Sequence, residues 1–155
     1  MKIQQVLYNA RKKSIDIIAN KKSYTLPYSR LRLKPKLADP IEAIYIDPEL
    51  AREGVTYRLK SGKEDSVPIS AFLDYNRDPD YLRNLALHQF SIIAIKAVKH
   101  CQLSKHELCR RLCTSPSQLY RLLDPTNTKK SVDEMLRLLS VLGCEIDWDI
   151  RILAA

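Results

Sequence analysis

The sequence is poor in glycine and contains no closely paired cysteines. Its three glycines, at positions 54, 62 and 143, cannot form a glycine-rich phosphate-binding loop. Its four cysteines form no Cys-x-x-Cys pair and no zinc knuckle with the three histidines, and no order of Ser, His and Asp stands out from chance. We therefore expect no enzyme, no cofactor and no bound metal. The alternative is a zinc site built from His100, Cys101, His106, Cys109 and Cys113.

Long apolar segments are also absent. No run of about 18 apolar residues exists, and the first residues show no apolar stretch followed by a small-residue cleavage site. We therefore expect a cytoplasmic protein without a membrane span, whose cysteines are reduced thiols. Apolar residues make up 45% of the chain and charged residues 28%, a composition that supports a folded core.

Positive charge dominates the sequence and is unevenly placed, with a net charge of +8. Residues 2–36 carry ten basic side chains against Asp16 alone, and residues 96–130 carry eight against Glu107 and Asp124. The intervening residues 37–80 hold five basic and ten acidic side chains. Two such basic blocks could neutralise the phosphates of a nucleic acid, but basic side chains that simply face solvent explain them equally well.

The first half of the chain, residues 1–75, predicts a small antiparallel β domain. Short runs of β-favouring residues alternate with turns at residues 20–22 and 61–63, which indicates two hairpins. Prolines fall between these runs or at their ends, where a missing amide does least harm to a sheet. The expected strands are Ser14 to Ala19, Ser23 to Leu26, Ile41 to Ile46, Val55 to Lys60 and Asp65 to Ile69.

The second half, residues 76–155, predicts helices followed by one strand, so the fold class is α+β. Asp78 and Pro79 have the properties of an N-cap and a first helical residue. Residues 144–153 alternate between apolar and charged side chains, which predicts a terminal β-strand. This strand must pair with the N-terminal sheet or with a second copy of the chain. The first helix is expected to bury Tyr81, Leu82, Leu85, Phe90, Ile93, Ala97 and Val98.

Two helices joined by a short turn are indicated near the middle of this half. Ser104 and Glu107 have the spacing of a capping box, and Ser115 and Pro116 are suited to begin the next helix. A second capping box at Ser131 begins a further helix. The expected buried residues are Leu108, Leu112, Leu119, Leu122 and Leu123 in the first two helices, and Val132, Met135, Leu136, Leu139 and Leu142 in the third.

Residues 85–143 resemble the helix-turn-helix domain of the lambda-repressor-like (Cro/cI, XRE) class. In that class a small residue is followed four positions later by a turn residue, and then by apolar residues six and nine positions further on. The corresponding residues here are Cys109, Cys113, Leu119 and Leu122. Steeply crossing helices need a small side chain where they touch. Cys113 departs from the pattern, because the turn often takes a residue with positive φ.

The resemblance implies that the helix beginning at Ser115 enters the major groove of duplex DNA. The expected base contacts are Ser115, Ser117, Gln118 and Arg121, of which Gln118 suits adenine and Arg121 suits guanine. Without the flanking motif these residues would be interpreted as ordinary solvent-exposed side chains. The expected phosphate contacts are Lys105, Arg110, Tyr120, Thr128, Lys129 and Lys130.

Residues 14–73 resemble the N-terminal domain of gamma-butyrobetaine hydroxylase-like proteins. The similarity lies in Arg30 to Arg32 and in Gly54 to Gly62. That family often carries zinc-binding cysteines near the first stretch, but this sequence has none before Cys101, so metal binding does not carry over. An extended segment should place Arg30, Arg32, Lys34 and Lys36 on one face, either as additional DNA contacts or as a solvated edge strand.

These features together predict a sequence-specific, double-stranded DNA-binding regulator of transcription, most simply a repressor. We expect a homodimer that recognises a pseudo-palindromic site and is nucleoid-associated when bound. The alternative is an antitoxin-type interaction module that neutralises a toxin-like partner protein and autoregulates its operon. A third interpretation makes the β domain a small-molecule sensor.

Overall fold

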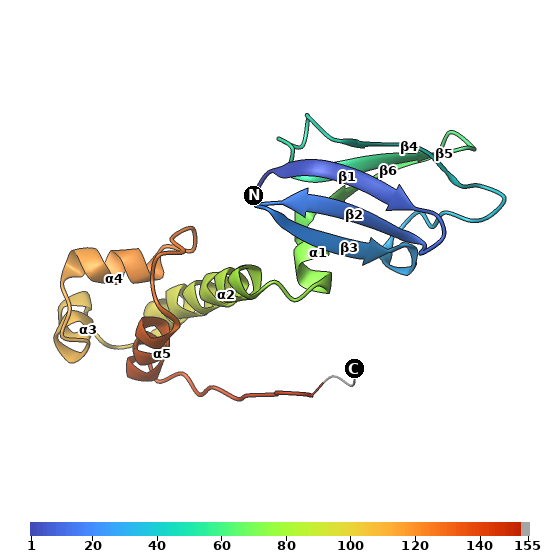
Figure 1. Cartoon of the computed structure of the whole chain (residues 1–155). Helices are drawn as coiled ribbons and strands as arrows, with labels where there is room; N and C mark the ends of the chain where they lie inside the picture. Colours follow the sequence, from blue (N-terminus) through green and yellow to red (C-terminus); the bar gives the residue numbers. More distant parts are fainter. Residues whose placement is uncertain (153–155) are drawn as a thin grey trace. The chain divides into compact units, whose positions relative to one another are not determined.

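The computed structural model describes residues 1–152 of the chain. They form an α+β protein with two three-stranded antiparallel sheets and five α-helices, as the sequence predicts (Figure 1). The chain divides into two compact units, Met1–Tyr81 and a second that begins at Leu82. Within the described residues, none of the helices has the length and apolar character needed to cross a membrane.

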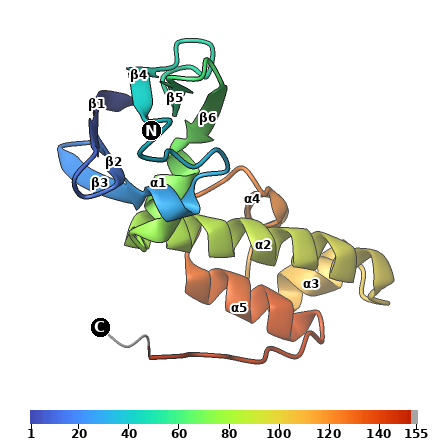
Figure 2. The ribbon, with the colours of Figure 1, turned by 90° about the vertical axis from the view of Figure 1, so that its right-hand side faces the viewer.

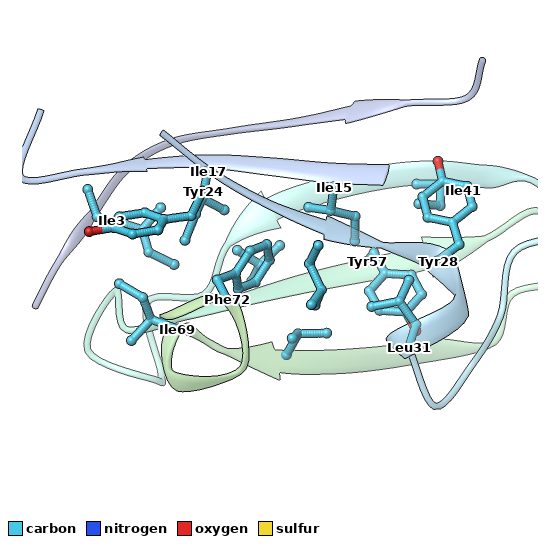
Figure 3. Packing of buried hydrophobic residues seen from close by; sticks show 14 of the residues in the cluster. Ile3, Ile15, Ile17, Tyr24, Tyr28, Leu31, Ile41, Tyr57, Ile69 and Phe72 are labelled. Carbon is cyan, nitrogen blue, oxygen red and sulfur yellow. The ribbon is translucent and has the colours of Figure 1, made fainter. Parts of the chain in front are cut away.

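The first unit contains both sheets. The first sheet has the order β1 (Ile3–Asn9), β2 (Ser14–Ala19), β3 (Lys22–Pro27), and the second has the order β4 (Ile41–Ile46), β5 (Gly54–Leu59), β6 (Glu64–Pro68). A short 3₁₀ helix η1 (Tyr28–Arg30) follows β3, and α1 (Ile69–Tyr75) follows β6. Side chains from both sheets and α1 form one buried core (Figure 3). The core includes Ile3, Ile15, Ile17, Tyr24, Tyr57 and Phe72.

All five predicted strands are confirmed to within one residue at each end. In the β2–β3 hairpin, Asn20 and Lys21 have φ angles of 49° and 62°, and Ala19 pairs with Lys22. Positive φ at both central residues is what a two-residue type I′ turn requires. In the β5–β6 hairpin, Gly62 has a φ of 83°. Strand β1 and helix α1 were not predicted.

The basic segment before β4 is not a strand. Leu31 is buried and Leu33 half-buried, whereas Arg32, Lys34 and Lys36 are exposed, so the predicted alternation is present. Arg30, however, lies in η1, and only an isolated bridge between Lys36 and Asp39 pairs this part of the backbone. Arg32 instead forms an ion pair with Asp65 of β6.

The two units divide inside helix α2 (Pro79–His100), between Tyr81 and Leu82, rather than between residues 75 and 76. Asp78 is the reason, because its carboxylate accepts hydrogen bonds from the Tyr81 amide (3.0 Å) and from the Tyr24 hydroxyl of β3 (2.9 Å). The first contact is the predicted N-cap of α2. The start of α2 is therefore fixed to the first unit.

The second unit packs α3 (Lys105–Arg111), α4 (Pro116–Leu123) and α5 (Val132–Val141) against α2 (Figures 1 and 2). The predicted apolar face of α2 is correct only in part: Phe90 and Val98 pack against the core of this unit, whereas Leu85 and Ile93 are exposed. The residues of α2 that are buried in the core are Leu87, Ser91 and Ala94, joined in the same cluster by Leu108, Leu119, Leu122, Met135, Leu138 and Leu139.

In the part that the structure describes, the predicted terminal strand does not form within the single chain, and its pairing with a second copy stays a prediction. Residues 144–152 form no strand, and Leu153 lies outside the described residues (Figure 1). Ile146 still packs on the core, but Trp148, Ile150 and Ile152 are 64%, 86% and 99% exposed. A strand needs a neighbour for its backbone groups. Among the described residues, no strand pairs with residues 144–152, named the C-terminal tail below.

Candidate nucleic-acid interface

Serine side chains begin the three helices of the candidate site. The hydroxyls of Ser104, Ser115 and Ser131 each accept a hydrogen bond from the amide three residues later, at 3.2, 3.2 and 3.0 Å. The predicted capping box at Ser131 is confirmed, because the Glu134 carboxylate accepts from the Ser131 amide at 2.8 Å. These caps fix where α3, α4 and α5 start.

The capping box predicted at Ser104 is only half formed. Glu107 turns its carboxylate away from the Ser104 amide and accepts from Arg110 and Arg111, each at 2.8 Å. Two guanidinium groups from the next turn of the helix compete successfully with one amide, because charge-assisted hydrogen bonds are the stronger ones. The same two contacts lower the pKa of Glu107 to about 2.

The turn between α3 and α4 places Cys113 at a φ of 50°. The Cys113 amide donates to Arg110 O at 3.2 Å, and the Thr114 amide donates to Cys109 O at 2.9 Å. This pair of hydrogen bonds is a Schellman motif, which takes a residue with positive φ at the position of Cys113. The turn thus has the geometry that the resemblance implies, with cysteine in the place where glycine is preferred.

The remaining positions of the pattern form the contact between the two helices. Cys109 is 7% exposed and Leu119 and Leu122 are almost fully buried, whereas Cys113 lies at the surface. Because α4 buries these two leucines, the opposite side of the helix must face solvent. Ser115, Ser117, Tyr120 and Arg121 are accordingly exposed.

Gln118 and Arg121 are linked to α5 by a chain of hydrogen bonds. The Arg121 guanidinium donates to Gln118 Oε1 at 2.9 Å, and Gln118 Nε2 donates to Glu134 Oε1 at 3.2 Å. Each atom of the Gln118 amide keeps one further hydrogen-bonding site, and the Arg121 guanidinium keeps several N–H groups. The same carboxylate that caps α5 therefore orients two of the predicted base-contacting side chains.

The predicted phosphate contacts fall into two groups on either side of α4. Lys105 lies over the ring of Tyr120, with its ammonium 4.9 Å from the ring centre and 3.0 Å from the hydroxyl oxygen. Because the Tyr120 hydroxyl accepts this bond, its own proton is left to donate elsewhere. Arg110, held by Glu107, is exposed on the same helix as Lys105. On the other side, Thr128 and Lys129 are exposed in the loop before α5.

Lys130 is a correction to the predicted phosphate contacts. It is 2% exposed, and its ammonium donates to the Ser91 hydroxyl of α2, to Leu122 O (2.7 Å) and to Asp124 O (2.6 Å). All three of its donors are used within the second unit. Burial lowers the pKa of this ammonium group. Lys130 therefore holds the end of α4 against α2 and does not face solvent.

The loop from Asp124 to Lys130 is ordered by side chains that the sequence analysis missed. Asp124 accepts from the Thr126 amide at 2.9 Å, and Asn127 accepts from the Lys129 amide at 3.0 Å. Arg83 of α2 donates to the carbonyl oxygens of Thr128 and Lys130, at 3.0 and 2.7 Å. These two contacts are Asx turns, in which Asp or Asn accepts from the amide two residues later, and this spacing could have been recognised in the sequence. The contacts of Arg83 had no such signal, because they span more than 40 residues.

A hollow of about 500 Å³ lies between α3 and α4. It brings together His106, Cys109 and Cys113, three of the residues that a zinc site would use. Across residues 1–152, however, no three His, Cys, Asp or Glu side chains are grouped so that they could hold a metal ion.

Comparison with known proteins gives no relative for this chain: no protein-family model, curated protein or solved structure matches it.

Proposed function

We propose that the second unit binds duplex DNA and that the protein is a sequence-specific regulator of transcription. The observation that carries this proposal is the division of α4 into two faces. Leu119 and Leu122 are buried against the other helices, while Ser117, Tyr120 and Arg121 are exposed. A helix fixed by a short turn, with polar and basic side chains outward, has the properties needed to enter a major groove.

The charges around α4 support the same function. Exposed basic residues flank the helix. The nearby carboxylates accept hydrogen bonds within the unit: Glu107 from Arg110 and Arg111, Asp124 from Thr126, and Glu134 from Ser131. Of these three carboxylates only Glu107 has cationic partners, and Asp124 and Glu134 keep their negative charge. The exposed basic side chains of α3, α4 and the following loop outnumber these carboxylates, so incoming phosphates meet a net positive surface. The proposed base contacts are Ser115, Ser117, Gln118 and Arg121, and the proposed phosphate contacts are Lys105, Arg110, Tyr120, Thr128 and Lys129.

The deciding experiment is selection of bound sequences from a random duplex pool, followed by titration of the selected duplex. Arg121→Ala should weaken binding by about 1–3 kcal/mol, roughly fivefold to 150-fold. Arg121→Lys keeps the charge but loses two-point contact with guanine, so it should relax specificity more than affinity. The control is Arg137→Ala, which removes an exposed arginine of α5. No enrichment, or equal effects of Arg121→Ala and Arg137→Ala, would contradict the proposal.

A homodimer would allow two copies to read a two-fold site. The C-terminal tail favours this assembly, because it carries exposed Trp148, Ile150 and Ile152 on an unpaired extended backbone. The same tail favours the antitoxin-type alternative, in which a toxin-like protein takes the place of the second copy. Self-association of the purified chain at micromolar concentration favours the homodimer, and a monomer that binds a protein encoded beside it favours the alternative.

A further inference from the structure

A pocket of about 300 Å³ opens at one end of the core of the first unit. Its walls come from the end of β1, the β1–β2 turn, η1, the loop before β4 and the start of β4. No residue of this pocket belongs to the proposed DNA-binding surface. The lining residues that matter here are Tyr8, Lys13, Tyr28, Lys36 and Ile41.

Tyr28 places a polar group at this pocket without a partner. It is 9% exposed, and within residues 1–152 its hydroxyl forms no hydrogen bond. The two other buried phenols of this core differ: Tyr24 donates to Asp78, and Tyr57 donates to Leu33 O at 2.6 Å. Figure 3 shows the Tyr28 ring beside Ile41, with its hydroxyl pointing away from Leu31 and Tyr57. The hydroxyl oxygen is not among the fully buried unpaired atoms, so it keeps accessible surface at the pocket and is free to donate to a ligand.

The charge of the pocket is positive. Lys13 and Lys36 are among its lining residues, and no Asp or Glu is. Asp39, which follows Lys36 in the same loop, accepts from the Ser61 amide and hydroxyl, each at 2.8 Å. Asp16 of the neighbouring strand β2 accepts from the Thr25 hydroxyl at 2.6 Å. The hydrogen bonds from Ser61 and the charge of Lys36 both lower the pKa of Asp39, so this carboxylate offsets part of the charge of Lys36. Within the lining itself, however, an anion would find two cations and no carboxylate.

The walls are held in place before any ligand arrives. The Tyr28 amide donates to Lys13 O at 2.8 Å, which joins η1 to the β1–β2 turn. Lys36 and Asp39 exchange backbone hydrogen bonds of 3.1 and 3.0 Å, and Pro35 and Pro40 stand on either side of this pair. Proline fixes φ, so the loop has few alternative conformations. Binding to a preformed site avoids the cost of ordering a loop.

We propose that this pocket binds a small organic carboxylate with an apolar body. The apolar body lies among the rings of Tyr8 and Tyr28 and the side chain of Ile41, and the carboxylate accepts from Lys13, Lys36 and the Tyr28 hydroxyl. A phenol is protonated at neutral pH and can donate, and burial raises the pKa of Tyr28 further from neutrality. The Tyr8, Tyr28 and Ile41 side chains form an apolar wall, and this favours an organic acid with an apolar body over inorganic phosphate, which has none.

The test uses the full chain and nuclear magnetic resonance shift mapping. The probes are benzoate, phenylacetate and indole-3-acetate, each compared with its neutral amide and with inorganic phosphate. We expect saturable shifts at the lining residues for the carboxylates, and at least tenfold weaker binding of the amides. Tyr28→Phe keeps the ring in the core and removes one donor, so carboxylate affinity should fall severalfold.

Lysine variants separate a specific site from general attraction to a basic surface. Lys13→Gln and Lys36→Gln should each weaken carboxylate binding severalfold and leave amide binding unchanged. Lys34→Gln makes the same change of charge at an exposed position outside the pocket and should have no effect. The proposal is overturned if none of the three carboxylates binds, if amides or phosphate bind as tightly, or if Lys34→Gln weakens binding as much as Lys13→Gln.

Discussion

The buried ammonium of Lys130 donates a hydrogen bond to the hydroxyl of Ser91, across 39 residues of sequence. Its two other donors bind Leu122 O and Asp124 O, which are among the last carbonyl groups of α4 and its C-cap. A cation at this end of a helix also interacts favourably with the helix dipole. One side chain thus fixes α4 against α2, and it does so from the interior of the unit.

Replacement of Lys130 should therefore reduce stability rather than remove a phosphate contact. Lys130→Met leaves the Ser91 hydroxyl without its donor and two helix-terminal carbonyls unpaired, at a cost of about 1–3 kcal/mol. Chemical denaturation followed by the helical circular dichroism signal measures this change. Lys129→Met alters the exposed neighbour and should change stability by less than about 0.5 kcal/mol. Equal stability of the two variants would contradict the role assigned to Lys130.

The turn between α3 and α4 should become more stable when Cys113 is replaced by glycine. Cys113 has a φ of 50°, a conformation that costs an L-residue about 1–2 kcal/mol, and glycine avoids most of this cost. We expect Cys113→Gly to stabilise the second unit by about 0.5–1 kcal/mol in the same denaturation experiment. Cys113→Ala controls for the loss of sulfur and should be nearly neutral.

The end of α5 provides the reciprocal test. Gly143 has a φ of 76° in a Schellman motif of the same kind, in which the Cys144 amide donates to Leu139 O at 2.9 Å. Gly143→Ala should destabilise the unit by about 1 kcal/mol. If Cys113→Gly destabilised the protein instead, the thiol would have a packing role that the exposed position of Cys113 does not suggest.

The ion pairs of Glu107 predict a pH dependence. Its pKa of about 2 lies below the ordinary value of 4.5, because Arg110 and Arg111 donate to the ionised carboxylate. A lowered carboxyl pKa means that the unfolded state binds the proton more readily, so this contribution to stability is complete above about pH 4.5 and is lost as pH falls towards 2. A carbon-detected titration of the Glu107 carboxyl measures the midpoint directly. In Arg110→Ala the midpoint should rise, whereas in Arg137→Ala it should not move.

Local signals in the sequence located most of the helices and strands. The Ser115-Pro116 start, the capping box at Ser131 and the Asn20 turn each depend on neighbouring residues, and the structure contains all three. Helix α1 was missed because Pro68 stands at its N-cap and provides no side-chain cap, and because the helix has only seven residues. Strand β1 was missed because a register shift between Ile3 and Gln5 interrupts its alternation.

The remaining errors come from contacts that sequence spacing does not specify. Lys130 has the sequence context of an exposed basic loop, and only the approach of Ser91 explains its burial. Glu107 has the spacing of a capping box, yet the rotamers of two nearby arginines decide its partner. Apolar and charged side chains do alternate along the C-terminal tail, but a β-strand also needs a neighbouring strand for its backbone hydrogen bonds. The sequence pattern indicates which face of a helix or strand is apolar, but it does not identify the element or partner that covers this face.

The tail provides the last prediction, because its sequence suits antiparallel pairing with a second copy of itself. In a register centred on Asp149, Trp148 of one chain lies opposite Ile150 of the other, and Asp147 lies opposite Arg151. The two copies of Asp149 also lie opposite each other, and this like-charge pair opposes the pairing that the other contacts favour. Both apolar pairs share one face, so pairing would cover side chains that are now exposed. Trp148→Ala should therefore weaken dimerisation by at least tenfold in sedimentation analysis, since aromatic residues at the centre of an interface contribute most.

Charge reversal tests the register itself. Asp147→Arg places two cations opposite each other and should weaken the dimer, and Asp147→Arg combined with Arg151→Asp should restore it, because the opposite charges are merely exchanged. Glu145→Arg reverses a charge whose partner in this register would lie at position 153, and it should have a smaller effect. A chain that stays monomeric at all concentrations, with the tail amides protected from hydrogen exchange, would instead indicate that the tail extends a sheet of its own chain.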